Sequence, residues 1–426
     1  MRVGLQSWGT EGDIRPFFAL ARALEQRGHE VRLLYTNVEG RDLSELGRGL
    51  GGTVTHVGAA YLHAQRERLD AQASENLRIR NPITQLERIF AQTMDPVADE
   101  MFQASRELAA WADLTVLHFL AHPAATAAEE KGRPFAWVAF APVHPTRTHP
   151  PIGAPRLGAW GNAALWSLAD RAMESILARR VNAVRATAGL PPVRRVVRAL
   201  RERACGALLA ISPAIYPRPA DFPARLELCG FLELPHEPGA LEPELLDFLD
   251  AGPPPAFFTL GSMGALLEEH AEHAALAMSQ AAARLQLRTI VQVPPAVAAR
   301  LQPAEHTFVL SRADHARVFP RCVVIVHHGG AGTTHAALRA GRPSVVVPHL
   351  ADQFFWADLL HRRRVAAPPL RRSALTPARL EARLAEILRQ PAFTTTAETL
   401  AASLTAEPGP AKACELLERF AASPRA

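Results

Sequence analysis

The chain has 426 residues, of which 48% are hydrophobic and 21% charged, so it is long enough and apolar enough to form two ordinary domains with buried cores. Its formal net charge is +5, yet only 6% of the residues are aromatic, whereas a nucleic-acid-binding face is expected to combine basic with aromatic side chains. Nucleic acid is therefore not an expected partner.

The four cysteines lie far apart and form no Cys-x-x-Cys pair, which predicts free thiols rather than a zinc site or a disulfide framework. The chain begins with a strand-like segment at 2–7, without the pattern of a signal peptide, and it contains no apolar run of 18 residues. We therefore expect a soluble, cytoplasmic protein.

In the first half, strand-like apolar runs alternate with helical periods, which predicts parallel βαβ units. The first strand is expected at 3–7, and the helix after it ends at Gly28. Apolar residues recur at helical spacing in that helix: Ile14, Phe17, Phe18, Ala21 and Leu24. Further strands are predicted at 31–35, 114–117, 135–140 and 207–211, with helical material over 77–108. The pattern predicts a Rossmann-type domain over 1–231.

Prolines then become dense, which indicates a linker at 232–255. After it, helical segments again alternate with strand-like runs, at 256–260, 288–293, 307–310, 323–326 and 344–347. We expect a second Rossmann-like domain over 256–405, followed by a C-terminal segment, 406–426, with a helix at 410–422.

The most informative segment is 322–338, where a β-branched run stops at two histidines and opens through three glycines onto a helix. Unpaired amides at a helix start carry partial positive charge, and glycines let an anion approach the backbone, so a pyrophosphate would fit at 329–334, where Thr333 and Thr334 add hydroxyl donors. The segment is neither a Walker A loop nor a dinucleotide fingerprint, because no lysine follows the glycines and Gly-x-Gly-x-x-Gly is absent. The alternative is a tight strand-to-helix turn.

Four ordered motifs spread over most of the chain carry a resemblance to a known family. They are Gly9-Thr-Glu-Gly-Asp-Ile-Arg-Pro16, Phe258-Thr-Leu-Gly-Ser-Met263, His327-His-Gly-Gly-Ala-Gly-Thr-Thr334 and Pro348-His-Leu-Ala-Asp-Gln-Phe-Phe-Trp356. The chain resembles the family 1 nucleotide-sugar-dependent glycosyltransferases, in the branch of sterol glucosyltransferases and bacterial antibiotic glycosyltransferases. The resemblance implies the α/β GT-B fold: two facing Rossmann-like domains with parallel sheets and a C-terminal helix that crosses back. It also implies that the donor nucleotide binds the C-terminal domain and the acceptor binds the N-terminal domain.

Glycosyl transfer requires a base for the acceptor hydroxyl, and Asp13 is the candidate. It follows the turn after the first strand, and the resemblance assigns this role to the matching aspartate of the antibiotic branch. The alternative from local sequence is helix capping, because aspartate is a favoured N-cap residue. Glu11 is the weaker candidate base. The catalytic histidine of plant relatives has no counterpart near the first strand.

The departing nucleoside diphosphate requires donors that stabilise its growing negative charge. The resemblance implies that His328 contacts the diphosphate, with Gly330, Gly332 and Thr333 supplying amides and a hydroxyl. Ser262 would add a hydroxyl and an amide from the opposite side, or it is an ordinary turn serine. His327 is expected to be structural.

The pair Asp352 and Gln353 matches the position where the family binds the donor hexose, although an acidic residue here also suits a helix start. The chain contains no Asp-x-Asp, and neutral donors with a helix N-terminus already serve the diphosphate. We therefore expect no metal ion and no cofactor, only a nucleotide-sugar co-substrate such as UDP-glucose or a dTDP-sugar.

Base recognition departs from the family pattern. Val293-Pro-Pro295 stands where many members carry Gly-Trp, and Asp314-His315-Ala-Arg317 replaces the usual Pro-His and leucine, so that His315 is a candidate base contact. Position 336 is alanine where plant members carry a glutamate for the ribose. The choice between uridine and deoxythymidine diphosphates stays open.

Three histidines of the first half, His118, His122 and His144, are candidates for the wall of an acceptor pocket, with plain packing as the alternative. The arginine-rich segment 179–203 is typical of a solvated helix face. A weak peripheral membrane contact through this segment is the alternative if the acceptor is a lipid.

These observations predict an inverting transfer of a hexose to a hydroxyl of a hydrophobic small molecule, such as a sterol, a macrolide, a polyketide or another aglycone. The alternatives are a nucleotide-sugar epimerase of similar fold and an inactive nucleotide-sugar-binding homologue. Either a monomer or a homodimer is compatible with the sequence.

Overall fold

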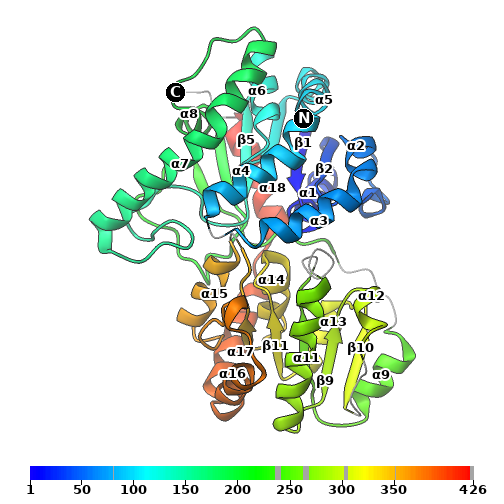
Figure 1. Cartoon of the computed structure of the whole chain (residues 1–426). Coiled ribbons are helices and arrows are strands. Elements are labelled where there is room, and N and C mark those ends of the chain that lie inside the picture. The colour runs from blue at the N-terminus through cyan, green and yellow to red at the C-terminus, as the bar shows by residue number, and fades with distance from the viewer. Residues whose placement is uncertain (80, 236–240, 262–267, 302–305, 351, 423–426) are drawn as a thin grey trace. The chain divides into compact units, whose positions relative to one another are not determined.

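The computed structural model describes residues 1–79, 81–235, 241–261, 268–301, 306–350 and 352–422. The chain forms two compact units, coloured along the sequence in Figure 1. Unit 1 comprises Met1–Pro213, Pro217–Pro235 and Pro408–Ala426, and unit 2 comprises Ala214–Tyr216 and His236–Glu407.

Unit 1 is built on a parallel seven-stranded sheet. Its strands are β1 (Arg2–Gly9), β2 (Glu30–Asn37), β3 (Thr53–His56), β4 (Leu114–His118), β5 (Phe135–Ala139), β6 (Gly206–Leu209) and β7 (Leu226–Leu228). Their order in the sheet is β3-β2-β1-β4-β5-β6-β7. The central strands β4 and β5 are buried along their whole length, as expected where helices cover both faces of a parallel sheet.

The helices of unit 1 are α1 (Glu11–Gln26), α2 (Ala59–Ala64), α3 (Arg66–Asn76), α4 (Pro82–Thr93), α5 (Ala98–Trp111), α6 (His122–Glu130), α7 (Gly158–Thr187), α8 (Val196–Arg203) and α18 (Gly409–Ala422), with 3₁₀ turns at Ser44–Gly47 and Asp95–Val97. The apolar period expected after the first strand is confirmed, because α1 buries all five of its predicted core residues. The helical material expected over 77–108 is divided between α4 and α5.

The C-terminal helix α18 packs on unit 1, as the resemblance implied. The Phe420 ring lies directly over Gly206 of β6, where a Cβ atom would be 2.2 Å from Cδ2 of the ring. At the other contact, the Glu418 carboxylate accepts two hydrogen bonds from Arg27, both at 2.8 Å, and lies 2.8 Å from Nε2 of His29. Helix α18 thereby joins the two ends of the chain within one unit.

Unit 2 contains a parallel five-stranded sheet. Its strands are β8 (Ala256–Thr259), β9 (Thr289–Gln292), β10 (Thr307–Leu310), β11 (Val324–His327) and β12 (Ser344–Val346), in the order β10-β9-β8-β11-β12. Its helices are α9 (Pro243–Asp250), α11 (Glu268–Arg284), α12 (Pro295–Ala298), α13 (His315–Val318), α14 (Ala331–Arg339), α15 (Gln353–Arg362), α16 (Pro377–Arg389) and α17 (Ala392–Thr405), with 3₁₀ turns at Phe319–Arg321 and Arg372–Ala374.

Neighbouring residues of the central strands of unit 2 enter different apolar clusters. Phe258 and Val326 belong to one cluster, whereas Phe257 and Ile325 belong to the other. This alternation places one cluster on each face of the sheet. The sheet is therefore a buried middle layer.

The structure differs from the linker that the sequence predicts at 232–255. Helix α9 lies in this range, and its Leu245 and Leu249 are buried in the core of unit 2. Pro243 is compatible with the helix because it occupies the first turn, where a missing N–H breaks no helical hydrogen bond. The same prolines that suggest a linker thus initiate a packed helix.

Each sheet contains one point where the order of the strands reverses. In unit 1 this point lies between β1 and β4, and in unit 2 it lies between β8 and β11. Ligands of open parallel α/β sheets bind outside the carboxyl ends of the strands at such a point. Functional side chains are therefore expected among the residues that follow β1, β4, β8 and β11.

Candidate active site

The turn after β1 holds Asp13 in a fixed position. Thr10 is the N-cap of α1, and Asp13 is the third residue of the helix, so the expectation that Asp13 could be the N-cap itself is wrong. Oδ2 of Asp13 accepts hydrogen bonds from the Thr10 amide at 2.9 Å and from the Thr10 hydroxyl at 3.0 Å. The carboxylate therefore completes a capping box with Thr10 and still faces the carboxyl end of the sheet.

Asp13 lies beside His118, the last residue of β4. Oδ1 of Asp13 is 3.9 Å from Nε2 of His118, which is too long for a hydrogen bond, and the Asp13 side chain remains 34% exposed. Burial raises the pKa of Asp13 to about 6, and the two hydrogen bonds from Thr10 act in the opposite direction. Burial lowers the pKa of His118 to about 3, so this imidazole is neutral beside the carboxyl group.

The other two candidate histidines of unit 1 have different surroundings. His122 begins α6 and is buried, and among the described residues neither of its ring nitrogens has a hydrogen-bond partner. Burial lowers its pKa to about 3. His144 lies elsewhere, with Nδ1 3.0 Å from the Pro145 carbonyl oxygen and its ring edge-on to Phe222. Of these three histidines, His118 is the one that lies beside Asp13.

In unit 2, the two histidines after β11 have distinct roles in the turn. Nδ1 of His327 accepts a hydrogen bond from the Gly329 amide at 3.1 Å, as suits the structural role expected for this residue. Gly329 has a φ of +88°, and a Cβ atom there would lie 2.8 Å from Val346. The left-handed backbone and the close packing together explain why glycine occupies this position.

The His328 ring is held between two glycines. A Cβ atom on Gly261, just after β8, would lie 2.6 Å from Cε1 of the ring, and one on Gly330 would lie 2.4 Å from Nε2. The ring is buried, its Nδ1 has no partner among the described residues, and burial holds its pKa well below the usual value. His328 is thus a neutral imidazole that can donate or accept one hydrogen bond at the carboxyl end of the sheet.

Helix α14 starts immediately beside this ring, with Gly330 as its N-cap. The first helical backbone hydrogen bond runs from Thr334 to Gly330 at 2.9 Å, so the amides of Ala331, Gly332 and Thr333 have no acceptor within the helix. Gly332 is exposed and Thr333 is half-buried, whereas Thr334 is fully buried. Of the two threonines, Thr333 is the accessible one.

The expected hexose-binding pair has one half-buried and one buried member. Asp352 is the half-buried N-cap of α15. Oε1 of the buried Gln353 accepts hydrogen bonds from the His349 and Leu350 amides, at 2.8 and 3.2 Å. Gln353 therefore shapes the loop that follows β12. The sequence pattern did not indicate this role.

The candidate base contact His315 is already engaged within unit 2. Its Nε2 is 2.8 Å from Oε1 of Gln292, at the end of β9, and its ring stacks on Phe319 with centroids 4.3 Å apart. Gln292, which contacts His315, was not among the candidate residues that the sequence pattern indicated. Ser262, the remaining diphosphate candidate, lies outside the described residues.

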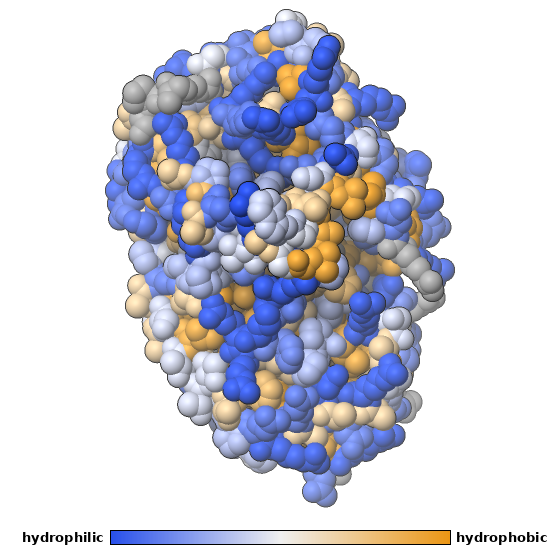
Figure 2. Space-filling model, turned by 90° about the vertical axis from the view of Figure 1, so that its left-hand side faces the viewer, coloured by the Kyte–Doolittle hydropathy of each residue, from blue (hydrophilic) through white to orange (hydrophobic). Residues whose placement is uncertain are grey.

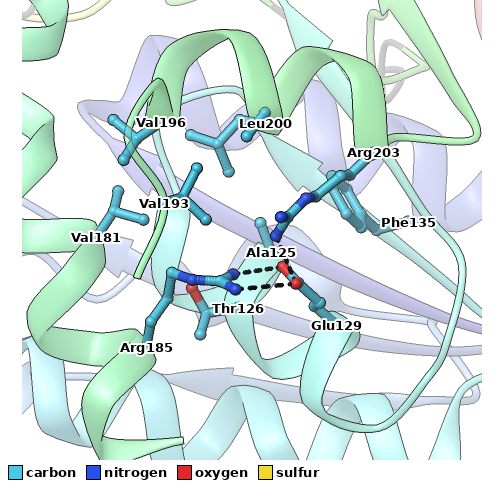
Figure 3. Close-up of a pocket in the computed structure, with 11 residues that line it drawn as sticks. Ala125, Thr126, Glu129, Phe135, Val181, Arg185, Val193, Val196, Leu200 and Arg203 are labelled. Atoms are coloured by element: carbon cyan, nitrogen blue, oxygen red, sulfur yellow. Dashed lines mark hydrogen bonds and ion pairs between the residues drawn. The ribbon is translucent and has the colours of Figure 1, made fainter. Parts of the chain in front are cut away.

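The arginine-rich segment 179–203 forms ion pairs inside unit 1. Figure 3 shows a crevice between α6, α7 and α8 in which Arg185 and Arg203 converge on the Glu129 carboxylate; Nη1 of Arg185 is 2.6 Å from Oε2. The buried Arg180 pairs with Asp95 and Glu87 at 2.7 and 2.9 Å. These three arginines therefore form ion pairs that connect neighbouring helices of unit 1.

The apolar side chains exposed near the start of α7 lie apart from those arginines in the sequence. Leu157, Trp160 and Leu168 are 60%, 78% and 61% exposed. Figure 2 shows, on the side that faces left in Figure 1, apolar surface interrupted by hydrophilic surface.

Among the described residues, no helix has the length and apolar character needed to span a membrane. No group of three or more histidine, cysteine or acidic side chains in the same part of the chain is arranged to hold a metal ion.

Comparison with known proteins identifies the family. Residues 310–420 match the family described as erythromycin biosynthesis protein CIII-like, C-terminal domain. The chain is 30% identical to O-mycaminosyltylonolide 6-deoxyallosyltransferase of Streptomyces fradiae, over 99% of this chain and 98% of that one. It is also 30% identical to vancomycin aglycone glucosyltransferase of Amycolatopsis orientalis, over 84% and 83% of the two chains. The crystal structure of glycosyltransferase VinC in complex with dTDP superposes with a TM-score of 0.66, at 22% identity and with 99% of each chain covered.

The two parallel Rossmann-like sheets and their structural relatives define the GT-B fold. The chain belongs to the family 1 glycosyltransferases, in the branch that contains the antibiotic glycosyltransferases. It is therefore an enzyme of the glycosyltransferase class.

Proposed function

We propose that this enzyme is an inverting glycosyltransferase that moves a hexose from a UDP- or dTDP-linked donor to a hydroxyl of a hydrophobic aglycone. Macrolides, polyketides and glycopeptides are the acceptor classes favoured by the relatives, since one acts on a tylonolide and another on vancomycin aglycone. The dTDP bound to VinC supports a diphosphate donor. The acceptor is assigned to unit 1 and the donor to unit 2.

The observation that carries the mechanism is the position of Asp13 in the turn after β1, with Oδ1 3.9 Å from the neutral His118 ring. A carboxyl group with a pKa of about 6 is largely ionised at neutral pH and still basic enough to take a proton. In the proposed step, the acceptor O–H bond breaks and its proton moves to Oδ1 of Asp13. The acceptor oxygen forms a bond with C1 of the sugar from the face opposite the diphosphate, and the configuration inverts.

The bond between C1 and the diphosphate oxygen breaks in the same step, and its electron pair remains on the diphosphate. The free amides at the start of α14, the Thr333 hydroxyl and the neutral His328 ring supply donors for this charge. Asp352 is proposed to bind sugar hydroxyls. We propose that the reaction needs neither a metal ion nor a cofactor, because these neutral donors and the helix dipole serve the diphosphate.

Mass spectrometry of products tests this function. The wild-type enzyme and Asp13→Asn are each incubated with UDP-glucose or dTDP-glucose and a panel of macrolides, polyketides, glycopeptide aglycones and sterols. We expect a mass gain of one hexose with at least one pair and a loss of about 10²–10⁴-fold in Asp13→Asn, the usual contribution of a general base. Chelation with EDTA should leave the rate unchanged.

The same experiment separates the alternatives. Conversion of the donor into an isomer without any acceptor would support the epimerase, although both named relatives are transferases. Binding of the nucleotide without turnover across the panel would support an inactive homologue. Full activity in Asp13→Asn would remove Asp13 from the role of base while leaving the glycosyltransferase class intact.

A further inference from the structure

The structure gives the proposed base an asymmetric carboxyl group. The Asp13 side chain accepts two hydrogen bonds, at 2.9 and 3.0 Å, and both come from Thr10 and end on the same oxygen, Oδ2. The Thr10 hydroxyl is placed by its own position as the N-cap of α1. The two carboxylate oxygens therefore differ, because Oδ2 accepts both hydrogen bonds from Thr10 and Oδ1 accepts neither.

The turn that carries Thr10 packs closely against Asp13. Gly9 has a φ of +142°, and a Cβ atom there would lie 2.3 Å from Oδ2 of Asp13. On the helix side, the Ser7 hydroxyl donates a hydrogen bond to the Asp13 carbonyl oxygen at 2.8 Å. The close approach of Gly9 and the hydrogen bond from Ser7 thus place Asp13 beside Thr10.

Among the described residues, the charged and titratable groups near this turn do not hold the Asp13 carboxylate in place of Thr10. His118, from β4, is neutral and stands 3.9 Å from Oδ1. Glu11 pairs with Arg15 at 3.1 Å and lies 4.0 Å from Arg41. Among the described residues, no arginine or lysine forms an ion pair with Asp13.

We propose that Thr10 is a positioning residue for the general base: its amide and hydroxyl hold Oδ2, so that Oδ1 is the atom that takes the proton of the acceptor. This inference rests on the proposed role of Asp13. Hydrogen bonds to a carboxylate favour its ionised form, so the Thr10 hydroxyl also opposes the effect of burial on Asp13. A residue outside the reaction thereby controls how much of the base is active at neutral pH.

The test compares Thr10→Val, which removes the hydroxyl at nearly constant volume, with Thr10→Ser, which keeps it. Both variants retain the backbone amide. The first readout is the ¹³C carboxyl resonance of Asp13 over a pH titration, assigned by its absence in Asp13→Asn, and it requires no substrate. We expect the pKa of Asp13 to rise by about one unit in Thr10→Val and to stay within about 0.3 units of the wild type in Thr10→Ser.

The second readout is the pH profile of kcat/KM for the acceptor found by mass spectrometry. The acidic limb of the profile should move upward with the pKa in Thr10→Val, so that the variant loses activity at pH 6.5 and recovers most of it at pH 8.5. A merely structural role would lower kcat/KM by the same factor at every pH. Thermal unfolding identifies any variant that fails to fold.

An unchanged carboxyl titration in a folded Thr10→Val would overturn the inference. That outcome is distinguishable from failure of the proposed function, which Asp13→Asn tests separately. If Asp13→Asn is inactive while Thr10→Val titrates and turns over like the wild type, Asp13 is the base and Thr10 only caps the helix.

Discussion

At the scale of single residues, the donor site proposed in unit 2 depends on how closely the backbone approaches the His328 ring. Gly261 and Gly330 leave room for this ring only because they lack a Cβ atom. The ring is neutral and buried, so its position rather than its charge would determine the proposed contact with a diphosphate. Small changes in the flanking backbone should therefore be visible in nucleotide binding.

Gly330→Ala should displace the His328 ring, because the new Cβ atom would lie 2.4 Å from Nε2. The backbone itself tolerates alanine, since φ of Gly330 is −63°. We expect about tenfold weaker binding of dTDP or UDP in isothermal titration calorimetry, equivalent to one lost hydrogen bond, and a shifted His328 ring signal by NMR.

Gly332→Ala is the matched comparison, since a Cβ atom there meets nothing within 4 Å. Its His328 signal should match that of the wild type. Weaker binding in Gly332→Ala would then report crowding at the amides of α14. An unshifted His328 signal in Gly330→Ala would contradict the packing described here.

At the scale of elements, the candidate residues of each unit lie in a strand-to-helix turn, from β1 into α1 in unit 1 and from β11 into α14 in unit 2. Each turn contains a glycine with positive φ, Gly9 at +142° and Gly329 at +88°. A side chain at either position would meet both backbone strain and a neighbouring atom closer than 3 Å. Glycine is therefore required in both turns, beside Asp13 in one and before the helix that follows His328 in the other.

Gly329→Ala should destabilise unit 2 by about 2–4 kcal/mol, combining the strain of a left-handed backbone with overpacking against Val346. Gly341→Ala is the control for strain, because its φ is +65° and the closest atom to its Cβ would be 3.3 Å away. We expect a smaller loss there, about 1–2 kcal/mol. Urea unfolding measures both; equal losses would show that packing at Gly329 has no effect.

At the scale of the whole molecule, buried neutral histidines link the stability of both units to pH. Burial lowers the pKa values of His118, His122 and His327 to about 3. The unfolded chain has ordinary histidines with pKa values of about 6.5, so it binds more protons than the folded protein between about pH 3 and 6.5. The contribution of these histidines to the free energy of unfolding is therefore complete above about pH 6.5. It decreases as the pH falls through that window.

The variant His122→Leu tests this linkage at one position. Neither ring nitrogen of His122 has a partner among the described residues, so leucine removes a buried polar group and a proton-binding site without breaking a hydrogen bond. We expect the difference in Tm between pH 7.5 and pH 5 to decrease, with Tm at pH 7.5 equal to or above that of the wild type. His306→Asn, at an exposed position, is the control. An undiminished pH dependence in His122→Leu would show that His122 is not a source of the effect.

Much of the fold was predictable because parallel sheets covered on both faces have strongly apolar strands. The segments near β1, β2, β4, β5, β6 and β8 to β12 were identified from this pattern. The strands β3 and β7 were missed because they are short strands at the ends of the sheet order, and β3 is exposed at alternate residues. Helix α9 was missed because prolines mark both linkers and helix starts.

The sequence by itself determined the local chemistry: a carboxylate after the first strand, a glycine-rich turn with histidines before a helix, and the family to which these motifs belong. Only the tertiary structure placed His118 beside Asp13 and Gly261 against His328. Those contacts arise because β4 pairs with β1 and β11 pairs with β8, across long separations in the chain. The spacing of apolar residues along a sequence predicts whether a segment forms a strand or a helix. The packing of the entire sheet decides which strands become neighbours.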